Sequence, residues 1–243
     1  MRSKISLLIL LGTLCSLCGV QAQSLQGPTG LLNAPSADML PEGTFFVGYH
    51  HFDKVNFKNF GEATSSGGFQ EGNFQAVILD MTLFSFMEIN FRSNQKDWIY
   101  SLDKSKHIQV DRNVSLKLRP LKEGKYLPSV AIGMIDVYGT GYEEMYYGVA
   151  TKHFTFSGHQ LGVTAGLAHS PQRYYNRNMN GFFGGLDYRP SFLPQLDVMA
   201  EYDSHAVNVG ASVLLFNHLY AIAGLQSCKH FSGGISYRVY LKN

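Results

Sequence analysis

Apolar side chains recur at every second position over most of the sequence after residue 43. In the segment 87–92, Met, Ile and Phe alternate with Glu, Asn and Arg, and the segment 114–119 repeats this pattern with Val, Leu and Leu. A period of two places the apolar residues on one face of a β-strand, whereas an amphipathic helix needs a period near 3.6. No segment shows convincing helical periodicity. The sequence therefore predicts an all-β fold.

The alternating segments number about twelve, an even number, as bacterial outer-membrane barrels have. They cover residues 43–52, 73–83, 86–94, 110–119, 128–137, 142–154, 159–169, 181–189, 195–203, 206–216, 218–227 and 230–241. We expect them to form an antiparallel, up-and-down transmembrane β-barrel of about 12 strands. Glycines within these segments, among the 25 of the chain, suit the curvature and tight packing of such a barrel.

The N-terminus has the features of a secretory signal. Arg2 and Lys4 precede a continuous apolar stretch over residues 5–20, and Val20–Ala22 supplies the small residues that signal peptidase requires. A membrane-spanning helix needs about 20 apolar residues, so cleavage near Ala22 is favoured over an uncleaved anchor. The residues before the two cysteines of this segment do not suit lipid attachment.

Three parts of the chain follow from this signal. Residues 1–22 form the signal peptide, residues 23–42 form a segment ahead of the first strand, and residues 43–243 form the barrel. The middle segment is rich in turn-forming residues and either plugs the barrel or docks on a periplasmic partner. We expect the mature protein in the outer membrane of a Gram-negative bacterium, surrounded by outer-membrane lipid.

Charge and cysteine content exclude several classes of protein. Loss of Arg2 and Lys4 with the signal brings the 20 basic side chains down to the number of acidic ones, 18, so nucleic acid is not an expected partner. Only Cys228 of the three cysteines then remains, so no internal disulfide can form, and the Cys/His spacing of a zinc site is missing. We expect no cofactor and no metal.

The gaps between the segments differ in length as the two ends of an outer-membrane barrel do. If the first strand rises from the periplasm, the gaps at 53–72, 95–109, 138–141 and 170–180, which include the longest ones, lie on the outer side and shorter turns lie opposite. Aromatic residues near the shorter turns are expected to form the girdle where the barrel meets the lipid headgroups. They are Phe84, Phe86, Tyr126, Phe154, Phe156, Phe192, Phe216 and Tyr220.

A soluble β-sandwich or a periplasmic barrel would show the same alternation. Its outward positions would be mostly charged, yet charged residues make up only 16% of this chain. The last strand also resembles the signal read by the outer-membrane assembly machinery, with Gly234, Tyr237 and Val239 in sequence, although Lys242 and Asn243 replace the usual final aromatic residue. These features favour the transmembrane barrel.

Several segments, in order along the chain, resemble the YjbH and GfcD family of exopolysaccharide-associated outer-membrane proteins. They are Gly30–Thr44, Ser115–Arg119, Glu123–Gly133, Gly139–Gly141, Ala150–Lys152 and Glu201–Asp203. The resemblance implies a β-barrel with a part in making, secreting or retaining an exopolysaccharide or capsule, without defining a reaction. It also implies a surface polysaccharide, and export proteins of the periplasm or outer membrane, as partners. Longer members of the family carry far more sequence and often a lipoprotein signal.

The inward face of the barrel is the surface that can touch a sugar chain. The alternation assigns to it a balanced set of acidic and basic residues: Glu88, Arg92, Lys117, Arg119, Asp187, Glu201, Asp203 and Arg238. These residues either form a salt-bridge network in a filled lumen or line a polar conduit for an exported glycan. In the second case tyrosines near the outer rim offer flat faces to the sugar rings, namely Tyr142, Tyr146, Tyr147, Tyr174 and Tyr175.

Two other functions remain as alternatives to a non-enzymatic role with polysaccharide. A lipid- or glycan-modifying enzyme needs a nucleophile and a base within reach, and His169 and His205 adjoin Ser170 and Ser204 in sequence. No G-x-S-x-G motif or paired metal-ligand spacing accompanies them, so catalysis is not the expected role. The other alternative is an accessory scaffold subunit of another outer-membrane assembly or secretion machine.

Overall fold

Twelve antiparallel strands close into a barrel in the computed structural model, which describes residues 21–54, 73–96, 110–139, 141, 143–171 and 178–242. Each strand pairs with its neighbours in sequence, and β1 pairs with β12 to close the sheet. The strands are β1 Thr44–Phe52, β2 Phe74–Phe84, β3 Met87–Lys96, β4 Val110–Leu121, β5 Ser129–Gly139, β6 Met145–Phe156, β7 His159–His169, β8 Gly181–Arg189, β9 Leu196–Tyr202, β10 Val207–Leu215, β11 Leu219–Gln226 and β12 His230–Tyr240. The predicted all-β antiparallel barrel is confirmed.

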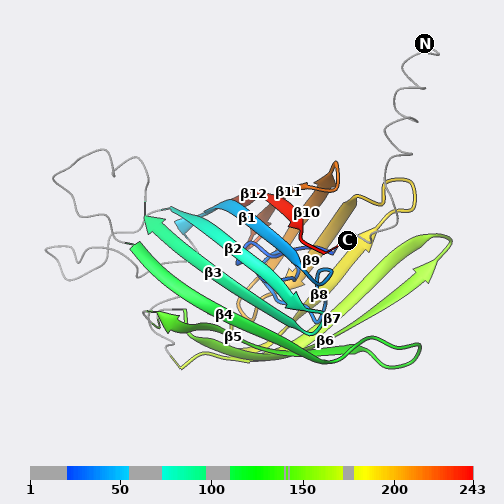
Figure 1. Cartoon of the computed structure of the whole chain (residues 1–243), viewed down its shortest axis with the longest axis horizontal. Helices are drawn as coiled ribbons and strands as arrows, with labels where there is room; N and C mark the ends of the chain where they lie inside the picture. The colour runs from blue at the N-terminus through cyan, green and yellow to red at the C-terminus, as the bar shows by residue number, and fades with distance from the viewer. Residues whose placement is uncertain are drawn as a thin grey trace, which may run out of the picture.

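The first and last strands begin and end at the same end of the barrel, which we call the terminus end. Thr44 at the start of β1 pairs with Tyr240 at the end of β12, and the C-terminus lies at this end in Figure 1. The β2–β3, β4–β5, β6–β7, β8–β9 and β10–β11 connections also lie here, and the β6–β7 hairpin projects from it (Figure 1). We call the opposite end the loop end.

Alternate residues of each strand face the lumen and the outer surface. On β3 the lumen-facing Glu88, Asn90, Arg92 and Asn94 are all buried. The outward positions of the barrel carry large apolar side chains that are exposed, including Val47, Tyr49, Val77, Phe91, Ile132, Phe154, Leu167, Leu186, Val198, Leu225, Ile235 and Tyr237. Buried charges inside and exposed apolar groups outside reverse the distribution of a soluble protein.

The lumen is filled by the chain itself. Residues 22–40 are buried except for the half-buried Gln26, and the dark blue trace of this segment runs among the strands in Figure 1. Its Leu25, Leu31 and Leu32 belong to the same apolar cluster as Phe46 and Phe183 of the barrel wall. We call residues 22–40 the plug, and the core of the molecule consists of the plug and the inward side chains of the wall.

Aromatic residues gather at the terminus end, as the alternation and turn positions predict. Seven of the eight expected girdle residues are exposed there: Phe84, Phe86, Tyr126, Phe154, Phe156, Phe192 and Phe216. The prediction for Tyr220 is wrong, because this residue is buried and its hydroxyl donates to the carbonyl oxygen of Gln23 in the plug. Tyr220 lies two positions from the buried Ile222, so the strand period itself turns it inward.

The described ranges contain no helix long and apolar enough to cross a membrane. Cys228 lies in the turn between β11 and β12, where it is exposed and free. The apolar stretch of the predicted signal, over residues 5–20, lies outside the described residues.

Candidate functional site

The plug enters and leaves the lumen at the terminus end. The carbonyl oxygen of Gln21 accepts a hydrogen bond from Arg238 near that end, whereas the backbone amide of Asn33 bonds Glu201 toward the loop end. The chain then returns, and Gly43 bonds the ends of β2 and β12. Two short antiparallel bridges fold the plug on itself, Gln23↔Thr29 and Gly30↔Pro35.

The first polar anchor of the plug is Glu88 on β3. Its carboxylate oxygens accept hydrogen bonds from the backbone amide and the hydroxyl of Thr29, at 2.6 and 2.7 Å. Lys117 on β4 lies 3.0 Å from the same carboxylate and donates to the carbonyl oxygen of Thr29 at 2.9 Å. Both charged side chains are only 1% exposed. The plug backbone therefore supplies hydrogen bonds that a buried ion pair needs.

The second anchor is Glu201 on β9. Its carboxylate accepts the backbone amides of two successive plug residues, Asn33 at 2.9 Å and Ala34 at 3.0 Å, and the side-chain amide of Asn208 at 3.0 Å. Gln226 on β11 donates to the side-chain oxygen of Asn33 at 3.2 Å. Hydrogen bonds between backbone amides and a carboxylate are among the stronger ones in proteins, so this contact fixes the turn of the plug near the loop end.

Wall glycines make room for the two leucines between these anchors. A Cβ atom added to Gly224 would lie 2.6 Å from the side chain of Leu32, and one added to Gly210 would lie 2.9 Å from it. A Cβ on Gly185 would lie 2.7 Å from the side chain of Leu31. These distances are shorter than any ordinary contact, so the strand glycines form a hollow that fits the plug.

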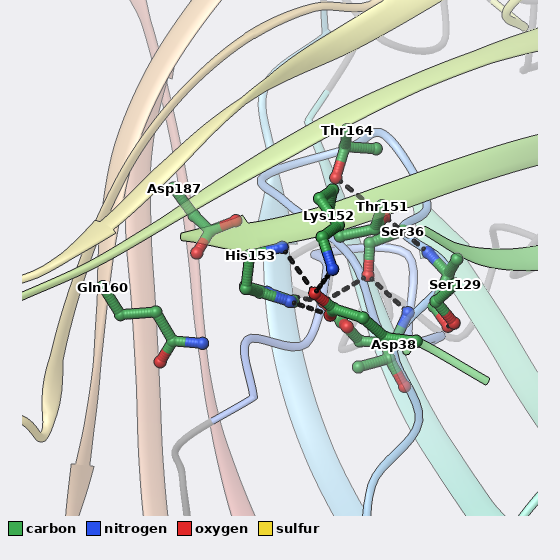
Figure 2. A network of polar contacts seen from close by, with 12 residues as sticks. Ser36, Asp38, Ser129, Thr151, Lys152, His153, Gln160, Thr164 and Asp187 are labelled. Atoms are coloured by element: carbon green, nitrogen blue, oxygen red, sulfur yellow. Dashed lines mark hydrogen bonds and ion pairs between the residues drawn. The ribbon is translucent and has the colours of Figure 1, made fainter. Parts of the chain in front are cut away.

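The third anchor holds the returning part of the plug. Thr151 on β6 accepts the backbone amide of Ala37 at 2.9 Å, and Ser129 on β5 donates to the carbonyl oxygen of Ala37 at 3.0 Å. Figure 2 shows Asp38 among these residues, with the ring of His153 directed toward its carboxylate. The His153 Nε2 and Asp38 Oδ2 atoms are 3.6 Å apart.

His153 also connects the plug to the turn between β4 and β5. Its Nδ1 atom lies 2.7 Å from one carboxylate oxygen of Glu123, and its backbone amide donates to the other at 2.9 Å. Lys152 lies 3.0 Å from the same carboxylate. Burial opposes ionisation of Glu123, but the hydrogen bonds from His153 and Lys152 outweigh it and lower the pKa of this carboxyl. Glu123 is therefore a carboxylate at neutral pH.

A cavity of about 540 Å³ opens beside this network at the terminus end, and we call it the vestibule. Its lining combines the end of the plug with the ends of wall strands and their turns, including Asp38, Pro41, Arg119, Lys122, Glu123 and His153. The volume lies in the range of small-ligand sites. The vestibule thus presents charges of both signs around a space that a small ligand or a short polymer segment fits.

Seven of the eight residues predicted for the lumen are buried inside the barrel: Glu88, Arg92, Lys117, Asp187, Glu201, Asp203 and Arg238. The eighth, Arg119, lies at the vestibule, where its guanidinium donates to the carbonyl oxygen of Ser85 at 2.6 Å. The structure brings together Glu88 and Lys117 as a pair. Glu201 and Asp203 share the side-chain amide of Asn208. The remaining predicted residues belong to separate clusters, so the set does not form one network.

Arg92 pairs with a glutamate outside the strands. Its guanidinium forms an ion pair with Glu143, between β5 and β6, and the side-chain amides of Asn94 and Asn113 donate to the same carboxylate at 2.9 and 2.6 Å. Burial raises the pKa of Glu143, with Arg92 opposing the shift. Strand periodicity cannot identify a loop residue of this kind, since its position in the lumen depends on the path of the loop.

Asp187 belongs to a cluster of which the sequence predicted one member. Asp187 lies 3.8 Å from Arg189, and Arg189 donates to Asp197 at 2.9 Å. Arg189 shares the strand parity of Asp187, so the same alternation was sufficient to place it inward. Arg189 is the last residue of β8 and Pro190 follows it, so the alternation ends there and the residue was not included in the predicted set.

Arg238 and Asp203 stabilise the two ends of the lumen. The guanidinium of Arg238 lies over the ring of Tyr220, 4.4 Å from its centroid. Tyr220 bonds Gln23 at the start of the plug, and Arg238 bonds Gln21 just before it. Asp203 accepts the side-chain amide of Asn208 at 2.8 Å and the backbone amide of Ala206 at 2.9 Å, and so orders the β9–β10 turn.

The tyrosines proposed for a sugar-binding rim are divided between the two faces of the wall. Tyr147 is buried and contacts the position of Gly133 on the neighbouring strand, whereas Tyr146 is exposed on the outside and donates to Glu144 at 2.7 Å. The other three lie outside the described residues: Tyr142, Tyr174 and Tyr175.

The serines beside the candidate catalytic histidines bond backbone carbonyl groups. Ser170 donates to Glu144 at 2.8 Å, and Ser204 donates to Phe182 at 2.8 Å. His205 bonds the carbonyl oxygen of Asn178 at 2.9 Å. In the part of the chain that the structure describes, no three His, Cys, Asp or Glu side chains are grouped to hold a metal ion.

Comparison with known protein families adds evidence independent of this geometry. Residues 22–240 match the family model YjbH, whose description is exopolysaccharide biosynthesis protein YbjH. The chain belongs to the YjbH family. A curated relative, the uncharacterized lipoprotein YjbH of Escherichia coli (strain K12), is 25% identical over 247 residues, which cover 90% of this chain and 32% of the relative. The chain thus spans about a third of the length of that YjbH protein.

The YjbH match begins at residue 22 and therefore includes the plug as well as the barrel. The segment Gly30–Thr44, which resembles the family, contains the second half of the plug. Four further segments of resemblance contain residues that bond the plug, namely Lys117, Ser129, Thr151 and Glu201. The sequence features typical of the YjbH family therefore coincide with the plug and its anchors.

Proposed function

We propose that this YjbH-family chain is a non-enzymatic outer-membrane β-barrel that takes part in producing, secreting or retaining an exopolysaccharide. The observation that carries the membrane part is the reversed polarity of the barrel. Charged residues such as Arg92 and Glu201 are buried inside, while large apolar residues such as Leu167 and Ile235 are exposed outside. An apolar outer band with a polar interior is the pattern of transmembrane barrels, and water would disfavour so large an apolar surface.

The aromatic residues of the terminus end support the same proposal. The rings of Phe84 and Phe86 stack with centroids 5.5 Å apart, and Phe154 and Phe156 are exposed on the neighbouring β6–β7 hairpin. Aromatic side chains are enriched where a barrel meets the lipid headgroups. We therefore assign the terminus end to the periplasm, with the loop end outside the cell and the signal peptide removed near Ala22.

The polysaccharide part of the proposal rests on the family. The model that matches residues 22–240 is described by exopolysaccharide biosynthesis. The plug occupies the lumen through many hydrogen bonds, which favours handling of the glycan at an end of the barrel over its passage through the centre.

Membrane fractionation and polysaccharide analysis test the two parts separately. We expect the mature protein to sediment with the outer membrane and to migrate differently in gel electrophoresis before and after boiling, as folded barrels do. We expect a strain that lacks the gene to lose surface polysaccharide and to regain it, with unchanged sugar composition, when the gene is restored. A soluble periplasmic protein would refute the membrane assignment. Unchanged polysaccharide in the deletion strain would refute the glycan role and favour an accessory scaffold.

A further inference from the structure

The lining of the vestibule carries basic and acidic side chains, and within the described part of the chain two of the basic ones have no acidic partner in direct contact. Each of its carboxylates has a basic partner: Glu42 lies 2.6 Å from Lys242, Glu123 lies 3.0 Å from Lys152, and Asp38 lies 3.6 Å from His153. Arg189, a basic residue of the lining, is likewise bonded to an acidic residue, Asp197.

Arg119 and Lys122 are the cations that this pairing leaves over. Arg119 donates to the carbonyl oxygen of Ser85, and within the described ranges neither Arg119 nor Lys122 has a carboxylate oxygen within 4.0 Å. Arg119 lies near the end of β4 and Lys122 directly follows that strand, and both line the cavity. Asp38 and Glu88 act on Arg119 only from beyond direct contact. Two cations without a directly bonded carboxylate, beside a cavity of about 540 Å³, create a site for an anion.

The rest of the lining suits a sugar. Gln160 and Ser85 offer groups that bond hydroxyls, and Met39, Leu40 and Pro41 offer apolar surface to the C–H faces of a sugar ring. A guanidinium presents a planar pair of donors that matches a carboxylate, and an ammonium adds a second charge. We propose that the vestibule binds a carboxylate-bearing sugar residue of the polysaccharide, a uronic acid, through Arg119 and Lys122.

This inference rests on the proposed function and names the class of glycan that the periplasmic end of the barrel recognises. The chain would then hold an acidic polymer segment at the mouth of the plugged barrel. Because the contact is made by two exposed or partly exposed cations, binding weakens as the salt concentration rises.

Calorimetric titration of the purified full-length mature barrel in detergent tests the site. The probe is trigalacturonic acid, with maltotriose as the neutral sugar and sodium sulfate as the anion without a sugar. We expect the acidic trisaccharide to bind, and Arg119→Gln/Lys122→Gln to weaken it at least about tenfold, as loss of charge-assisted hydrogen bonds does. Lys125→Gln is the matched control, because Lys125 lies on the same turn and over the ring of Tyr126.

Three results would overturn the site: no binding of trigalacturonic acid, equal binding of maltotriose, or equal binding of sulfate. Lys122→Glu is a second variant for the case that Arg119→Gln disturbs the β2–β3 turn, and heat-dependent migration checks that each variant is folded.

Polysaccharide measurements separate this inference from the proposed function. If the unmodified barrel restores polysaccharide in a deletion strain but binds no acidic sugar, the site is wrong and the function stands. If the deletion strain keeps its polysaccharide, the function is wrong whatever the vestibule binds.

Discussion

At the scale of single residues, the plug is held by buried charges that are bonded to backbone groups. Glu88 and Lys117 bond each other and both polar backbone groups of Thr29. Glu201 accepts two successive plug amides in the same way. A buried ion pair gains little by itself, because desolvation of the two charges offsets their attraction. Its value here is specificity, since a shifted plug would leave these charges without partners.

Replacing Lys117 alone therefore costs more than replacing the pair. We expect Lys117→Met to lower the free energy of unfolding by about 3–5 kcal/mol, because it leaves the Glu88 carboxylate buried without its cation. The double variant Glu88→Gln/Lys117→Met is expected to lose less than Lys117→Met. Urea unfolding of the refolded barrel in detergent measures both values.

The exposed pair between Lys242 and Glu42 supplies the matched control for that experiment. Its lysine is 69% exposed, so Lys242→Met should change the free energy of unfolding by no more than about 1 kcal/mol. The interpretation of Lys117 would be wrong if its replacement cost no more than that of Lys242.

At the scale of the elements, the plug and the wall fit through a glycine hollow. Leu32 is completely buried against Gly210 and Gly224, and Leu31 lies against Gly185. Glycine in a strand normally weakens the strand. At these positions the missing side chain allows the plug to make close contact with the wall. The fit makes the plug part of the folded core rather than a segment loosely placed in the lumen.

Truncation of Leu32 measures this contact. We expect Leu32→Ala to lower the free energy of unfolding by about 2–5 kcal/mol, because the side chain is fully buried and the rigid wall cannot close the cavity. Leu225→Ala, at an outward position that is 41% exposed, is the control and should cost clearly less. Equal losses at the two positions in the same urea unfolding assay would mean that the plug does not contribute to the stability of the barrel.

The strands were predictable from the sequence, whereas the contacts of the plug were not. Alternation of side chains is a local signal, and it identified all twelve strands and the inward position of residues such as Arg92 and Glu201. It did not reveal that Glu201 bonds Asn33, because that pairing joins residues 168 positions apart and depends on the path of the plug. Tyr220 was misassigned because its aromatic ring outweighed the strand period in the prediction.

At the scale of the whole molecule, the barrel has an apolar outside and a lumen closed by its own chain. Among the strands that the structure describes, the closed sheet leaves no edge unpaired. The plug starts and ends at the terminus end and returns on itself within the lumen. A barrel of twelve strands whose lumen were empty would enclose a water-filled space, so we expect the plug to determine whether solutes pass.

The last prediction concerns that permeability. We expect the intact mature chain, reconstituted in a planar lipid bilayer, to show no discrete channel openings, because residues 23–40 of the plug fill the lumen. A variant without residues 24–38 is expected to conduct ions and to admit small sugars in a liposome-swelling assay.

Since this deletion also removes core contacts, Leu31→Asp/Leu32→Asp is a second variant that keeps the chain length. Its unpaired buried charges are expected to expel the plug from the glycine hollow. Heat-dependent migration identifies the folded fraction of each variant. Stable openings from the intact chain would contradict the closed lumen, and a folded deletion variant that conducts no ions would mean that the wall side chains alone seal the barrel.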